Sequence, residues 1–284
     1  MNKLICKDYT VSGKEFELVY NSDLEMYITH PKPSEKELPI YYKSEAYISH
    51  TDSKKSLFDK VYQLVKNYTI SKKVKLIDSF QTKEKTLLDI GCGTGDFLSA
   101  SQKKEWEVSG IEPNIDAQKL ALTKLKKNSI IYFDIDELLE KDTTKKFDVI
   151  SLWHVLEHVP DYDDYIKKIK ELLKKEGVLI IAVPNHKSYD AQFYKNFWAA
   201  FDVPRHLWHF SQKSIRLIFG KHKMEVVKTL PMKFDSYYVS LLSEKNKKGK
   251  TNPFVAFMVG FKSNLRAYRT KEYSSLIYIF KNIK

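Results

Sequence analysis

The sequence predicts a doubly wound α/β fold, because three features of the chain agree. From residue 86 onward, short apolar runs alternate with segments whose apolar residues have helical spacing. The first apolar run is followed at once by a turn that contains Gly91, Gly93 and Gly95. The second apolar run ends in an acidic residue, Glu112. Alternating strands and helices are typical of a parallel sheet covered by helices, in which ligands bind beyond the carboxyl ends of the strands.

Length and composition indicate an ordered globular protein. A chain of 284 residues forms one large domain or two small ones, and buries enough apolar surface to fold without disulfides. Its two cysteines, Cys6 and Cys92, are too few for a disulfide framework or a four-ligand zinc site. The N-terminus lacks the apolar core of a secretion signal, and no run of about 18 apolar residues occurs. We therefore expect a cytoplasmic protein without a membrane span.

The net charge of +12 is compatible with a nucleic-acid partner or an anionic membrane surface. Nearly all of the excess is lysine, however, and the chain has only four arginines. Arginine is the residue that binds phosphates and bases through two parallel hydrogen bonds. The lysines are scattered over many expected helical faces, with a short cluster at 245–250. We interpret the charge as a solvated, lysine-rich surface and expect no nucleic-acid partner.

The expected elements follow from the spacing of apolar residues. Residues 1–50 form an N-terminal segment that is β-like up to residue 33, because Phe16, Leu18 and Tyr20 recur at every second position. Residues 51–284 form the main domain, which opens with a helical cap over 54–80. A helix over 163–173 ends in a basic turn and Gly177, and an insertion over 236–270 is helical. Strands are expected at 86–90, 107–111, 129–133, 147–152, 178–183, 224–230 and 274–280.

The glycine turn indicates the chemistry of its ligand. Glycine has no Cβ, so the turn can adopt left-handed dihedrals and let a ligand lie against the backbone. The spacing is G-x-G-x-G, whereas dinucleotide sites use G-x-G-x-x-G. Asp89, just before the turn, would face a cationic amino group, and Glu112 would accept both hydroxyls of a ribose. A cationic amino acid joined to a nucleoside is S-adenosylmethionine, which we predict as the cofactor, with S-adenosylhomocysteine as its product.

The residues from Asp89 to Gly95 resemble the first motif of the class I S-adenosylmethionine-dependent methyltransferases, of the methyltransferase-23 type. The resemblance implies a Rossmann-like sheet of seven strands, with the last strand inserted antiparallel. It also implies that Asp134 accepts a hydrogen bond from the adenine amino group and that Ile135 packs on the ring. The alternative for Asp134 is an exposed residue that only begins a helix. The expected cofactor-binding residues are Asp89, Gly91, Cys92, Gly93, Gly95, Glu112, Pro113, Asp134, Ile135 and Trp153, together with Tyr42 and Tyr47.

Two N-terminal features are interpreted through the same resemblance. In related enzymes a tyrosine-rich segment before the first long helix folds over the cofactor, and Tyr42 and Tyr47 lie in such a segment here. The alternative is that these tyrosines only pack against the helices. Some methyltransferases of this group begin with a zinc ribbon, but Tyr20 and Asp23 stand where its cysteines would be. We therefore expect a degenerate, zinc-free segment.

A second motif follows the fourth expected strand. The run Leu-Glu-His-Val-Pro at 156–160 resembles the ubiquinone-biosynthesis O-methyltransferases, in which an acidic and histidine cluster at this place is linked to a divalent cation. This chain has His154 where those enzymes typically carry Glu. We therefore predict no metal, and expect Glu157 and His158 to fix the loop by hydrogen bonds. His154 is expected on the substrate side, where we assign it a catalytic role.

The segment after the fifth strand commonly builds the acceptor pocket in this fold, and here residues 189–210 are rich in aromatics. His206 within it is the expected general base, because its unperturbed pKa is close to working pH. Asp202 and Arg205 either take part or form a pair that locks the loop. The sequence thus predicts methyl transfer to an oxygen or nitrogen of a small, partly apolar acceptor. The alternatives are a noncatalytic S-adenosylmethionine-binding protein, a methyltransferase that acts on a macromolecule, and a nicotinamide dehydrogenase.

Overall fold

The computed structural model describes residues 3–34, 36–42 and 57–283, and these form two compact units. Among the described residues, the first unit comprises 3–34, 36–42, 156–162 and 182–278, and the second comprises 57–155, 163–181 and 279–283. The domain boundary expected at residue 50 lies outside the described residues and stays a prediction. Within the first unit, part of the segment after the fifth strand pairs with the N-terminal strands.

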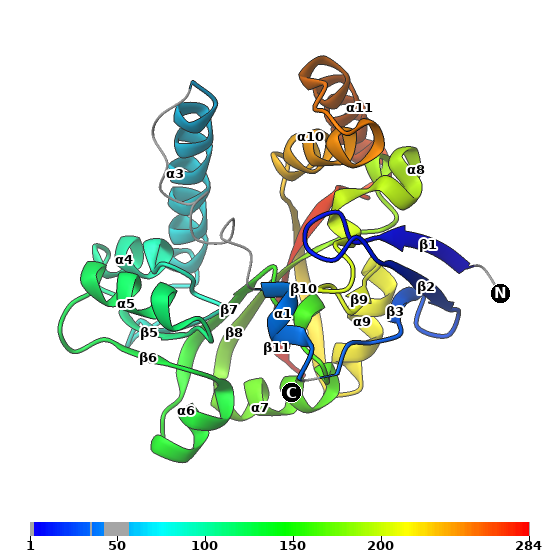
Figure 1. Ribbon diagram of the computed structural model, residues 1–284. Coiled ribbons are helices and arrows are strands. Elements are labelled where there is room, and N and C mark those ends of the chain that lie inside the picture. The colour runs from blue at the N-terminus through cyan, green and yellow to red at the C-terminus, as the bar shows by residue number, and fades with distance from the viewer. Residues whose placement is uncertain (1–2, 35, 43–56, 284) are drawn as a thin grey trace. The chain divides into compact units, whose positions relative to one another are not determined.

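The expected seven-stranded sheet is confirmed (Figure 1). Its strand order is β10-β11-β8-β7-β4-β5-β6, and β8 and β11 contribute residues to both units. The pairings β4–β5, β4–β7 and β5–β6 are parallel. The strands are β4 (Thr86–Ile90), β5 (Glu107–Ile111), β6 (Ile130–Tyr132), β7 (Phe147–Trp153), β8 (Leu173–Pro184), β10 (Met224–Pro231) and β11 (Ser275–Asn282).

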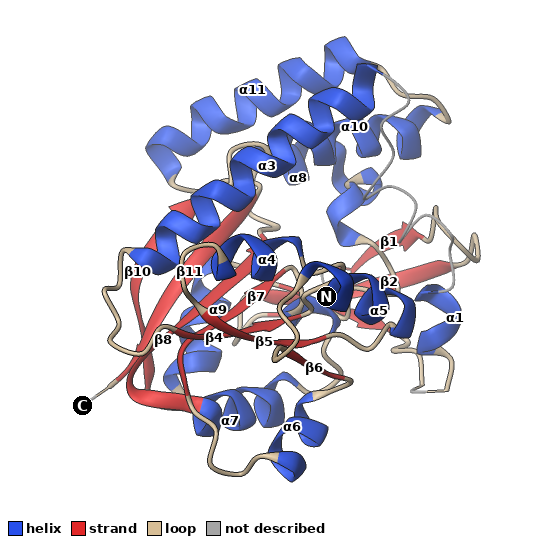
Figure 2. Cartoon of the chain, turned by 90° about the vertical axis from the view of Figure 1, so that its left-hand side faces the viewer, coloured by secondary structure: helices blue, strands red, loops and turns tan. Residues whose placement is uncertain are grey.

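The register of the parallel strands positions the glycine turn. Asp89 of β4 lies opposite Gly110 of β5 and Ser151 of β7. The leucines and isoleucines of β4 are almost completely buried, as expected for a strand covered on both faces. The strands β4, β5 and β7 run side by side (Figure 2). Because they are parallel, the residues that follow them, including Gly91 and Glu112, gather at one edge of the sheet.

The expected helices of the second unit are present, with one shifted boundary. The helix expected over 163–173 is α7, but it ends at Leu172 and β8 begins at Leu173. The extended backbone at the start of β8 places Lys174 Nζ 3.0 Å from the Asp148 carboxylate at the start of β7. The helices are α3 (Leu57–Asp78), α4 (Asp96–Gln102), α5 (Ile115–Lys124), α6 (Ile135–Lys141) and α7 (Tyr162–Leu172).

The β-like N-terminal segment is confirmed as part of a second sheet in the first unit. Its strands β1 (Lys3–Lys7), β2 (Glu15–Asn21) and β3 (Met26–His30) are antiparallel. Phe16 and Leu18, which recur at every second position, are both buried. The fourth strand, β9 (Trp208–His209), comes from the aromatic segment after β8 and pairs with β3.

Both expected helices of the 236–270 insertion are present as α10 and α11. The helical elements of the first unit are α1 (Leu38–Tyr42), η1 (Leu156–His158), α8 (Tyr189–Tyr194), η2 (Lys195–Phe197), η3 (Ala199–Phe201), α9 (Gln212–Gly220), α10 (Asp235–Lys248) and α11 (Pro253–Thr270). Among the helices in the described ranges, none combines the length and the apolar character needed to cross a bilayer.

A buried carboxylate connects several of these elements. Asp190 of α8 is completely buried. Its oxygens accept hydrogen bonds from Trp198 Nε1 at 2.8 Å, from Ser263 Oγ of α11 at 2.6 Å and from Ser274 Oγ at 2.6 Å. A buried carboxylate is tolerated only where such donors replace water. Asp190 therefore holds α8, α11 and the residues before β11 together.

We expect Asp190→Ala to lower the free energy of unfolding by about 3 kcal/mol, because three buried donors lose their acceptor. Urea denaturation measures the change. Glu17→Ala is the control in the same unit, since it removes an exposed ion pair with Lys3 and should have a much smaller effect. Equal losses for the two variants would show that the network contributes no more than a surface pair.

Candidate functional site

The glycine turn after β4 needs glycine at each position for a different reason. Gly91 and Gly95 have φ angles of +72° and +75°, in the left-handed region. A Cβ on Gly91 would lie 2.4 Å from Val155 Cγ2, and one on Gly95 would lie 2.8 Å from Ala121 Cβ. Gly93 also has a positive φ, +54°, but a Cβ there would meet nothing within 4 Å. The turn is thus closely packed at both ends and open at Gly93.

Glu112, the first residue after β5, holds this turn in place. Its carboxylate is buried, with Oε2 accepting from Gly93 N at 2.8 Å and Oε1 accepting from Asn114 N at 2.9 Å. Burial raises the pKa of Glu112 above its usual range, while the two backbone N–H groups oppose that shift. Each carboxylate oxygen has a further lone pair. The oriented side chain can therefore accept hydroxyl hydrogens from a ligand at the turn.

Asp89 supplies a second buried carboxyl group at the same turn. Ser151 Oγ of β7 donates to its Oδ1 at 2.6 Å. Burial raises the pKa of Asp89 to about 7, and nearby Glu112 adds to this effect, whereas Ser151 and Lys73 oppose it. Two buried carboxyl groups disfavour a phosphate and favour a positively charged ligand group. The geometry therefore supports the expectation that the turn binds a cationic amino acid rather than a pyrophosphate.

The other expected cofactor residues of the second unit have defined places. Asp134 is exposed, and its Oδ1 accepts from Glu137 N at 2.8 Å, so it caps α6 as the alternative interpretation expected. Its contact with adenine stays a prediction, as does that of Ile135, which is buried beside it. Cys92 is buried against Gly110, and burial raises the pKa of its thiol. Pro113 is exposed next to Glu112.

Residues at the end of β7 line the same edge of the sheet. The Trp153 ring meets Phe97 edge-on at 5.9 Å, and Lys73 Nζ of α3 lies 4.1 Å from the Trp153 ring centre. His154 follows with a φ of +58°, a left-handed conformation that is uncommon outside glycine. Such strain is concentrated at functional sites. Sequence reasoning missed Lys73, because nothing in a helical pattern indicates which lysine reaches the ring.

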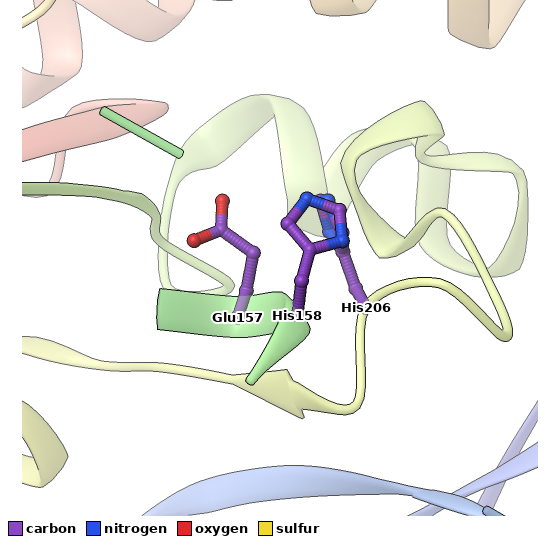
Figure 3. Close-up of side chains that lie close together, drawn as sticks. All are labelled: Glu157, His158 and His206. Atoms are coloured by element: carbon purple, nitrogen blue, oxygen red, sulfur yellow. The ribbon is translucent and has the colours of Figure 1, made fainter. Parts of the chain in front are cut away.

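The first unit contains a compact group of Glu157, His158 and His206 (Figure 3). Each of the three offers one ligand atom, and these atoms lie within 4.8 Å of one another. Glu157 and His158 come from η1, and the loop before β9 carries His206. Leu207 N donates to the Glu157 carbonyl at 2.8 Å, which holds the two segments together. The imidazole rings of His158 and His206 meet edge-on with centres 4.5 Å apart.

Hydrogen bonds assign the proton on His206. Its Nδ1 lies 2.9 Å from the Ala200 carbonyl, which can only accept, so Nδ1 carries the hydrogen. The other ring nitrogen, Nε2, is then the one that can bind a proton or a cation. His158 Nδ1 lies 2.9 Å from Tyr42 Oη and 3.1 Å from the Arg205 carbonyl. Burial, with a smaller effect of His206, lowers the pKa of His158 to about 4, so this ring is neutral at pH 7.

The remaining predicted residues are placed as follows. Arg205 Nη2 donates to Asp202 Oδ1, so this pair locks the loop, as one of the two interpretations expected. The Asp202 carboxylate also lies 3.8 Å from His206 Nε2. Tyr42 contacts His158 within the first unit, and its role toward the cofactor stays a prediction. Tyr47 lies outside the described residues. Sequence reasoning did not join His206 to Glu157 and His158, because nearly fifty residues separate them.

The comparison with protein families agrees with this geometry. The protein-family model described as "Methyltransferase domain" matches residues 54–229, which is more than half of the chain. The chain belongs to this methyltransferase family. The matched region of the methyltransferase domain includes the glycine turn, Glu112, the Glu157–His158 pair and His206.

Curated relatives match a shorter stretch of the methyltransferase domain. A ubiquinone biosynthesis O-methyltransferase from Histophilus somni is 35% identical over 109 residues, which is 36% of this chain and 46% of the relative. The protein of that name from Pelagibacter ubique is 40% identical over 107 residues, or 36% of this chain and 44% of the relative. The chain therefore spans less than half the length of these relatives in the match.

Solved structures share the fold of the methyltransferase domain. A magnesium protoporphyrin IX methyltransferase from Synechocystis PCC 6803, with bound SAH, has a TM-score of 0.57 at 16% identity and covers 87% of this chain and 100% of its own. A 1,6-didemethyltoxoflavin-N1-methyltransferase from Burkholderia thailandensis has a TM-score of 0.55 at 14% identity, and the match covers 93% of this chain and 99% of that structure's chain. Likeness at this identity establishes the fold.

Buried neutral histidines make the stability of the protein depend on pH. Burial lowers the pKa of His186 to about 4, and that of His209 well below its usual value. The unfolded chain then binds more protons than the folded one below about pH 6.5, so stability falls as the pH drops toward 4. His186→Gln keeps a donor for the Glu25 carbonyl, which lies 3.3 Å from His186 Nε2, but does not titrate.

Between pH 6.5 and pH 5, we expect wild-type protein to lose about 1.5 kcal/mol more unfolding free energy than His186→Gln. Urea denaturation at the two pH values provides the measurement. Parallel losses in both proteins would contradict a neutral, buried His186.

Proposed function

We propose that the chain is an S-adenosylmethionine-dependent methyltransferase that methylates an oxygen or nitrogen of a small, partly apolar acceptor. The observation that carries the proposal is the glycine turn, open at Gly93 and oriented by the buried Glu112 carboxylate, in a chain of the methyltransferase family. A cytoplasmic location and the absence of a nucleic-acid partner belong to the same proposal.

The residues at the turn fit this cofactor chemically. The open space at Gly93 lets a ligand approach the backbone, and Glu112 accepts the ribose hydroxyls. Asp89 pairs with the ammonium group, whose charge would return the Asp89 carboxyl to its ionised form. Asp134 and Ile135 are proposed for the adenine, with Pro113 and Trp153 beside them. When bound, the cofactor supplies an electrophilic methyl group on a sulfonium.

The contribution of the chain to the reaction is placement and proton removal. Holding donor and acceptor in line can lower the barrier by about 7–11 kcal/mol. The Nε2 lone pair of His206 accepts the proton of the attacking oxygen or nitrogen, a role typically worth about 10²- to 10⁴-fold in rate. The Ala200 carbonyl favours the tautomer of His206 that presents this lone pair, and the His158 ring packs edge-on against it. His154, strained at the end of β7, is proposed to face the acceptor.

A second role for His206 has its own observation. Glu157, His158 and His206 form a donor set of one carboxylate and two imidazoles, which suits a divalent cation. This chain has His154 where the O-methyltransferases that are linked to a cation typically carry Glu. His206, from another segment, would supply a third ligand beside Glu157 and His158. A cation bound there would orient the acceptor oxygen and lower its pKa.

The names of similar proteins support a small acceptor. The curated relatives are ubiquinone biosynthesis O-methyltransferases, and the two similar structures are a magnesium protoporphyrin IX methyltransferase and a 1,6-didemethyltoxoflavin-N1-methyltransferase. The acceptor pocket expected from the 189–210 segment stays a prediction, because its buried aromatic side chains, such as Trp198 and Phe201, pack within the core of the first unit. A noncatalytic protein would bind the cofactor without turnover, and a macromolecular acceptor would leave small phenols unmethylated.

Binding of S-adenosylhomocysteine tests the cofactor. We expect calorimetry to detect binding to the wild-type protein and none of NAD. Gly93→Ala should weaken binding about tenfold or more, because its Cβ fills the open space at the turn. Gly249→Ala is the matched control, since Gly249 also has a positive φ and nothing within 4 Å. Equal affinity of the two variants would contradict a ligand at Gly93.

Transfer of labelled methyl groups from S-adenosylmethionine to a panel of small phenols and amines tests the reaction. We expect His206→Ala to lower kcat by about 10²-fold or more, with unchanged affinity for S-adenosylhomocysteine. Calorimetric titration with Mn²⁺ and Zn²⁺ separates the two roles of His206. Cation binding that is lost in both His206→Ala and Glu157→Gln supports the cation, and activity unaffected by EDTA supports the base. Full activity of His206→Ala would contradict both roles.

A further inference from the structure

The helix α11 buries small side chains and exposes large apolar ones, the reverse of the usual arrangement in a surface helix. Its buried face consists of small residues, namely Ala256, Val259, Gly260, Ser263 and Ala267. A Cβ on Gly260 would lie 2.9 Å from Tyr237 Cα, so the backbones of α10 and α11 approach closely. The two helices lie side by side in both views (Figures 1 and 2). Of the large apolar side chains of α11, Phe257 stacks on Tyr237 of α10 with ring centres 5.4 Å apart and is still 56% exposed.

Those large side chains form a stripe on the outer face. The stripe follows the spacing i, i+3, i+4, i+7, i+11 and i+14, which places its members along one side of a helix. Their exposed fractions are between 47% and 74%. Large exposed apolar patches mark interaction sites. The members are Phe254, Phe257, Met258, Phe261, Leu265 and Tyr268.

Basic residues lie on one flank of this stripe and in the segment before it. Residues 233–271 contain nine lysines and arginines but only two acidic residues, and one of these, Glu244, is buried. Within α11 there are three basic residues and no acidic one. Lys262 and Arg266 lie along one flank, where both pass over the Tyr189 ring, at 5.2 and 4.6 Å. The exposed lysines 245, 247, 248 and 250 precede the start of α11.

We propose that α11, with the basic end of α10, docks on an anionic lipid surface. A helix with aromatic and aliphatic residues on one face and lysine or arginine beside them is typical of helices that lie in the plane of a bilayer interface. Basic residues next to the apolar face add attraction to anionic headgroups. Long basic side chains can keep their charge at headgroup level while their stems contact apolar surface.

The apolar stripe and the positive charge together favour an anionic lipid surface over other partners. A nucleic acid would be bound by the basic residues but would leave six large apolar side chains in water. A second copy of the chain would bring the same positive charge to its partner, and like charges across an interface are unfavourable. The proposal thus differs from the solvated lysine surface expected from composition, since it gives a partner to the basic residues beside one apolar face.

Flotation with lipid vesicles tests the proposal independently of catalysis. We expect wild-type protein to float with vesicles of phosphatidylcholine that contain about 30% phosphatidylglycerol, and to dissociate in about 0.5 M salt. The triple variant Phe254→Ser, Leu265→Ser, Tyr268→Ser should bind at least about tenfold more weakly, because it removes the three most exposed apolar side chains of the stripe. The double variant Lys250→Glu, Arg269→Glu should weaken binding similarly.

Matched controls separate these effects from general changes in charge or hydrophobicity. Lys126→Glu with Lys127→Glu makes the same change in net charge elsewhere, and Leu120→Ser, Leu122→Ser and Val227→Ser remove exposed apolar side chains elsewhere. Both controls should float like the wild type. Circular dichroism confirms that each variant is folded.

Three outcomes would overturn the proposal. The first is no flotation of the wild type, and the second is equal flotation with vesicles of pure phosphatidylcholine. The third is a dimer in analytical ultracentrifugation that the triple variant dissociates, without vesicle binding, which would identify a second copy as the occupant. Flotation that is anion-dependent and sensitive to both sets of α11 variants supports the lipid surface. Loss of methyl transfer would leave this result unchanged.

Discussion

The hydrogen bond from Gly93 N to the Glu112 carboxylate connects the turn after β4 with the end of β5, and the candidate cofactor site depends on it. Parallel pairing of β4 with β5 brings the glycine turn and Glu112 to one edge of the sheet. The second oxygen of Glu112 holds Asn114, whose side chain caps α5. One buried carboxylate thereby orients the turn, the start of the next helix and its own remaining lone pairs.

Burial has opposite consequences for the ionisable groups of the two units. At the glycine turn it raises the pKa of two carboxyl groups, which makes the turn favourable for a positively charged ligand. In the first unit it keeps His158, His186 and His209 neutral, so their hydrogen bonds are those of uncharged rings. His206 beside them directs its Nδ1 hydrogen to the Ala200 carbonyl, which leaves Nε2 as the ring nitrogen that can bind a proton or a cation.

Packing by small residues explains how one helix can serve two purposes. Gly260 and Ser263 let α11 approach α10 and reach Asp190, and this contact needs no large side chain. The six large apolar residues of α11 then remain exposed on its outer face, with Lys262 and Arg266 along one flank. The stability of the first unit and the proposed attachment to lipid are thus carried by opposite faces of the same helix.

The sequence by itself determined the order of the strands along the chain, the glycine turn and the acidic residue after β5, because all of these are local patterns. The spacing of Phe16 and Leu18 and the apolar run 86–90 are sufficient to place strands. Only the tertiary structure brought His206 to Glu157 and His158, and β9 to β3, since no periodicity connects segments that are distant in the chain. Only burial decided which face of α11 is exposed, because its small and its large apolar residues both recur at helical spacing.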